Sequence, residues 1–156
     1  MADEQRSARG GIERVIATLN GLIETCKNGE EGFRTAAEGV SDQAVKTAFA
    51  KIARDRWQMA RELQDEVQGL GGNPETSGSV GGAVHRGWMN IKSVVTGRDD
   101  QKIIAEAERG EDVAKAAFQA ALDEPLPTQV RALVERLAVQ VRAAHDQVRA
   151  MEKSPR

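Results

Sequence analysis

The sequence is short of cysteine and of aromatic residues. Cys26 is the single cysteine in 156 residues, so the chain can form no internal disulfide and no zinc site built from several cysteines. Tyrosine is absent and aromatic residues make up only 3% of the chain, whereas alanine is frequent. Because strands favour aromatic and β-branched residues while alanine favours helices, this composition predicts closely packed helices and no sheet.

An excess of one charge and a long apolar run are also missing. The 22 basic and 24 acidic residues are mixed along the chain and leave a formal net charge of -2, so no basic block indicates nucleic-acid binding. No apolar run approaches the ~20 residues that span a membrane, and residues 1–11 lack the apolar centre of a secretion signal. We therefore expect a cytoplasmic protein with neither a nucleic acid nor a membrane as partner.

Helical periodicity is the strongest pattern that the sequence does contain. Apolar residues recur at steps of three and four, which is the period of an amphipathic helix. The segments that show this period are about 12–40, 43–70, 101–123 and 128–151. Residues 1–10 and the last few residues fall outside it, and we expect them to be frayed.

The connection between the second and third of these helices is much longer than the others. Its first part is rich in Gly, Ser and Asn, but apolar residues then repeat at helical spacing and predict a short helix over about 79–96. The other two links are short, so they join antiparallel pairs. We expect one all-α domain: a four-helix bundle of ferritin-like topology, ordered over about 12–151, made of two helical hairpins with a short crossover helix.

A Gly-Glu pair lies in the middle of the first and third long helices. The segments Asn28-Gly-Glu-Glu31 and Arg109-Gly-Glu-Asp112 place Glu30 and Glu111 on the apolar side of their helices. Burial of a carboxylate in a core costs free energy unless a metal ion or a basic side chain binds it. The alternative is that each carboxylate lies at the edge of the apolar face and is solvated.

The second and fourth long helices carry basic side chains that could pair with these carboxylates. Two arginines balance two glutamates, and a guanidinium can bond a carboxylate in two places. We therefore predict a buried polar network of Glu30, Arg56, Glu111, Arg142 and His145.

This half-repeat resembles the ferritin-like superfamily. Its di-iron proteins use one Glu on each of the first and third helices, and Glu-x-x-His on each of the other two. Glu30 and Glu111 match the single-Glu positions, but the other two motifs read Arg56-x-x-Met59 and Arg142-x-x-His145. The resemblance therefore implies that three of six ligands remain.

More narrowly, the chain resembles a family of small bacterial ferritin-like proteins of unknown function. The segments that carry this resemblance are residues 22–33, 85–88, 108–112 and 144–146. The family implies a fold and a stress-associated setting but no activity.

The substitutions argue against a di-iron centre. An arginine at the place of a bridging carboxylate would set a fixed positive charge beside two cations in a low dielectric. We therefore expect no cofactor and a non-enzymatic, structural or stress-associated interaction role as a homo-oligomer, such as a dimer. The alternative is a metal-binding protein that holds iron or manganese with Glu30, Glu111 and His145 for redox or storage work.

Three residues are candidates for a contact surface. We expect His85 and Trp88 to pack the crossover helix against the bundle. The alternative is that they form an exposed dimer patch. Trp57 lies off the apolar stripe of its helix, so we expect it to pack under the crossover or in a subunit contact. Cys26 is predicted to be an ordinary core residue.

Overall fold

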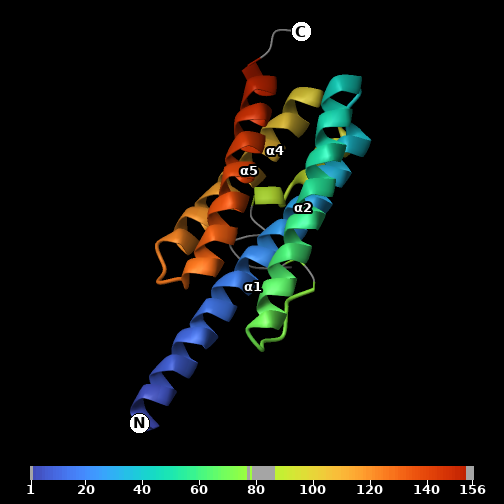
Figure 1. Ribbon diagram of the computed structural model, residues 1–156. Coiled ribbons are helices and arrows are strands. Elements are labelled where there is room, and N and C mark those ends of the chain that lie inside the picture. Colours follow the sequence, from blue (N-terminus) through green and yellow to red (C-terminus); the bar gives the residue numbers. More distant parts are fainter. Residues whose placement is uncertain (1, 77, 79–86, 154–156) are drawn as a thin grey trace.

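The computed structural model describes residues 2–76, 78 and 87–153, and these residues are mostly helical with no strand among them. The helices are α1 (Ala2–Gly39), α2 (Gln43–Gly69), α3 (Ile91–Thr96), α4 (Asp100–Leu122) and α5 (Thr128–Lys153). Helices α1 and α2 form one hairpin and α4 and α5 form another, and the two hairpins pack into a bundle (Figure 1). The predicted all-α architecture of two hairpins is therefore confirmed.

Helix α1 is longer than the sequence pattern predicted. It begins at Ala2, not near residue 12, and its first part projects beyond the rest of the bundle (Figure 1). Ile12 is 43% exposed, and Val15 is the first buried residue of the helix. The expectation of a frayed start was wrong because Ala, Glu, Gln and Arg have high helix propensity, and the helix continues without packing.

Aspartates begin the two central helices and connect the hairpins. The Asp42 side chain accepts a hydrogen bond from the backbone N–H of Val45 at the start of α2. Asp100, at the start of α4, accepts hydrogen bonds from the backbone N–H groups of Ser41 and Asp42. This carboxylate therefore joins the turn of the first hairpin to the second hairpin.

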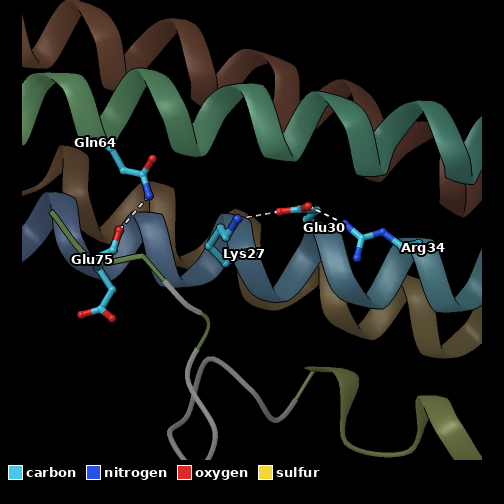
Figure 2. Close-up of polar contacts among 5 residues, drawn as sticks. All are labelled: Lys27, Glu30, Arg34, Gln64 and Glu75. Atoms are coloured by element: carbon cyan, nitrogen blue, oxygen red, sulfur yellow. Dashed lines mark hydrogen bonds and ion pairs between the residues drawn. The ribbon is translucent and has the colours of Figure 1, made fainter.

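The crossover helix is shorter than expected. Helix α3 covers only Ile91–Thr96 and follows a single 3₁₀ turn at residues 87 and 88. The rest of the predicted helix, residues 79–86 with His85, lies outside the described residues. The start of the crossover is held against α2, where the Gln64 side chain donates to the carbonyl of Glu75 (Figure 2).

Trp88 fills the space between α1 and α4. The side chain is 5% exposed and makes an edge-to-face contact with Phe33, with 4.9 Å between the ring centroids. A Cβ atom at Gly32 or at Gly110 would lie 2.2 Å from the indole, a distance that no packed side chain tolerates. Trp88 is therefore not an exposed patch, and these two helix glycines form its seat.

Substitution of Gly110 by Ala should push the indole out of this seat. We expect Gly110→Ala to lower the free energy of unfolding by ~1–3 kcal/mol, as overpacking does. In a Trp57→Phe background, Trp88 fluorescence should also shift to the red. Urea denaturation followed by fluorescence measures both effects.

The matched control is Gly21→Ala. A Cβ atom at Gly21 meets nothing within 4 Å, so this change should stabilise α1 by up to about 1 kcal/mol. Equal effects of the two substitutions would contradict the proposed seat.

Candidate functional site

The centre of the bundle contains a buried ion pair between the two hairpins. Nη1 of Arg56 on α2 donates to Oε1 of Glu111 on α4, and Nη2 donates to Oε2, both at 2.6 Å. Arg56 is 2% exposed and Glu111 is fully buried. The two parallel hydrogen bonds leave the pair neutral, and each carboxylate oxygen has a charged donor.

This pair separates the hydrophobic core into two clusters. Along α2, Ile52 belongs to one cluster and Met59 to the other, with Arg56 between them. Along α4, Ala107 and Ala114 flank Glu111 in the same way. The pair is thus a single polar layer across an otherwise apolar bundle, at the middle of the helices.

The surroundings of Arg56 fit a guanidinium closely. A Cβ atom at Gly29 would lie 3.0 Å from Nη1 of Arg56, so glycine leaves room where another residue would crowd the arginine. The Phe33 ring lies 5.6 Å from the guanidinium carbon, within cation–π range. Burial opposes the charged form, but the charge and hydrogen bonds of Glu111 outweigh it and raise the pKa of Arg56 above its usual value.

Cys26 is a neighbour of this pair on α1. Its side chain is fully buried, and burial raises the pKa of the thiol to about 12, although the charge of Arg56 opposes the rise. The thiol therefore stays protonated, which removes the nucleophilic form.

Glu30 does not join this pair, contrary to the sequence prediction. Its carboxylate is bound within α1, by Lys27 at 3.0 Å on one oxygen and by Arg34 on the other. The three side chains follow one another along the helix (Figure 2). Spacings of three and four residues allow a helix to satisfy its own carboxylate, so no partner from α2 is needed.

His145 and Arg142 also lie apart from the central pair. Nε2 of His145 on α5 contacts Oδ1 of Asp112 on α4 at 2.7 Å, and His145 itself is 4% exposed. Arg142 is exposed, so its assignment to the buried network was wrong. The side chains predicted as one network therefore form separate local groups, and only Arg56 and Glu111 meet in the core.

Glu106 is a further buried carboxylate that was not predicted from the sequence. It is 1% exposed and accepts hydrogen bonds from the backbone N–H of Asn90 and from Arg109. These bonds hold the crossover against α4, next to Trp88. Glu106 follows the buried Ile103 by three residues on α4, and its i,i+3 spacing to Arg109 was the available signal.

The donor set does not fit the alternative metal site. Both oxygens of Glu111 are held by Arg56, Glu30 is bound by bases of α1, and His145 is bound to Asp112. Within the described ranges, no group of three or more His, Cys, Asp or Glu side chains is placed to hold a metal ion. A di-iron centre needs several carboxylates and imidazoles around one space, and these three residues do not share one.

Comparison with protein families gives a match over most of the chain. Residues 14–124 match a domain of unknown function, DUF2383. The chain belongs to this family. The match includes the Arg56–Glu111 pair and Trp88 but ends before His145. No curated protein matches the chain, and none of the helices described here is long and apolar enough to cross a membrane.

Removal of Arg56 alone should leave the Glu111 carboxylate buried without a positively charged partner. We expect Arg56→Met to lower the free energy of unfolding by about 3–5 kcal/mol, and Arg56→Met with Glu111→Gln to cost much less. Chemical denaturation of both variants measures this coupling.

Arg142→Met is the matched control because this arginine is exposed on α5. Its effect should stay within about 0.5 kcal/mol. Costs that simply add in the double variant would show that Arg56 and Glu111 are not coupled.

The thiol of Cys26 should be inert in the folded protein. Because its pKa is about 12, we expect a chromogenic disulfide reagent to modify it only after the bundle opens. The reaction rate should therefore rise with urea along the unfolding transition. Rapid, stoichiometric modification of the native protein would contradict the buried position.

Proposed function

We propose that this chain is a ferritin-like helical protein in which an arginine–glutamate pair has replaced the di-iron centre. On this proposal it is a structural or stress-associated interaction protein and not an enzyme. The observation that carries the proposal is the bidentate contact between Arg56 and Glu111, at 2% and 0% side-chain exposure.

The arrangement of the helices supports a ferritin-like origin. Two antiparallel hairpins are joined by the long crossover, as in ferritin-like bundles with one crossover. Glu30 and Glu111 occupy matching places in the two Gly-Glu segments of α1 and α4. A metal ion at this layer would therefore compete with Arg56 for the oxygens of Glu111.

The chemistry of the pair supports a structural role. Arginine stays protonated at any physiological pH, and Glu111 has both oxygens bonded, so neither group is free to accept a proton from a substrate. Removal of one partner is costly because the other charge is then left buried without a partner, and this cost fixes the height of α2 relative to α4 across the bundle. The bundle would therefore act through its surface.

Metal analysis tests this proposal. Protein purified without chelator and then equilibrated with Fe(II) or Mn(II) should retain far less than one metal ion per chain after gel filtration. Stoichiometric iron or manganese in the wild type that is absent from Glu111→Ala would contradict the proposal. A wild type and a Glu111→Ala variant with equally little metal would support it.

A further inference from the structure

An open apolar groove runs between α1 and α2 on the surface of the first hairpin. Its volume is about 840 Å³, and small residues such as Ala37, Ala50 and Ala53 line it. Trp57 lines the same groove with 44% of its surface exposed, and the Arg61 guanidinium lies 5.2 Å from its ring. An exposed tryptophan beside a groove of alanines is typical of an interaction surface.

Charged side chains follow the two rims of the groove in a regular order. The α1 rim carries Glu30, Arg34 and Glu38, and the α2 rim carries Arg54, Ala50 and Lys46. Both rows step by four residues, a rise of about 6 Å, and the two helices are antiparallel. The rows therefore stay level, with Glu30 near the height of Arg54 and Glu38 near that of Lys46.

A second copy could face this groove with its two-fold axis either along or across the helices. With the axis along the helices, α1 of each copy lies over α2 of the other at the same height. Glu38 of each copy then faces the partner's Lys46. With the axis across the helices, each rim meets its own reversed copy, so Arg54 faces the partner's Lys46 and like charges oppose one another.

We infer that the α1–α2 groove is the interface of a homodimer whose two-fold axis runs along the helices. The opposite charges of Glu38 and Lys46 meet twice in this arrangement, whereas the crossed arrangement is repelled. The inference rests on the interaction role proposed above and names its partner as a second copy of the chain. In this dimer Trp57 would pack over the partner's α1, near the height of Lys27.

Charge reversals in separate chains test the pairing across the interface. Glu38→Lys alone and Lys46→Glu alone each create two like-charge pairs in a homodimer, so each variant should sediment as a monomer. An equimolar mixture of the two variants restores both opposite-charge pairs and should form dimers. The wild type should sediment at twice the 16.9 kDa chain mass.

Two controls keep this experiment independent of folding. Trp57→Ser should also be monomeric while keeping the wild-type circular dichroism, and Glu135→Lys, an exposed change on α5, should stay dimeric. Because Lys46 also donates to the Ala37 carbonyl, thermal unfolding of Lys46→Glu should establish that it is folded.

The outcomes separate this inference from the proposed function. A monomeric wild type, or a dimer that persists in Glu38→Lys and Trp57→Ser, would overturn the interface. Single variants that stay monomeric when mixed would overturn the arrangement of the copies. None of these results changes the metal content, which is the readout for the proposed function.

Discussion

The need to balance a buried charge governs the centre of this bundle. Arg56 and Glu111 lie at the same level between two apolar clusters, and each would be very costly there without the other. Their two hydrogen bonds have one favourable geometry, so they set the height of α2 relative to α4. Apolar side chains alone would allow the two hairpins to slide past one another at less cost.

The glycines around the pair follow from the same constraint. Gly29 lets the guanidinium pass close to α1, while Gly32 and Gly110 let the indole of Trp88 lie between α1 and α4. Glycine lowers helix stability by about 1 kcal/mol relative to alanine, and the room it leaves for these two large side chains offsets that cost. Glu106 then holds the backbone next to Trp88 through the N–H of Asn90.

Much of the fold could be predicted because amphipathic periods and caps are local. The predicted limits of α2, α4 and α5 agree with the structure to within two residues, with Asp42 and Asp99 at the starts of the first two. The predicted first helix was too short because the prediction required apolar packing, whereas residues 2–14 of α1 are helical without it. The seat of Trp88 depends on contacts distant in sequence, which periodicity does not report.

The candidate site was harder to predict for a geometrical reason. Periodicity places Arg56, Glu111 and Glu30 on inward faces, but it does not tell which side chains reach one another. Glu30 has bases three residues before it and four after it, and these local partners bind it before α2 can. Arg142 lies beyond the edge of its apolar face, and a long side chain at such a position turns to water.

The bidentate pair of Arg56 and Glu111 can be observed directly in solution by nitrogen-15 NMR of the Arg56 guanidinium. Two bonds to Glu111 should stop rotation about the Nε–Cζ bond, so the Nη protons should give separate, slowly exchanging signals. These signals should merge in Glu111→Gln. A single, rapidly averaged Nη signal in the wild type, like that of an exposed arginine, would contradict the account.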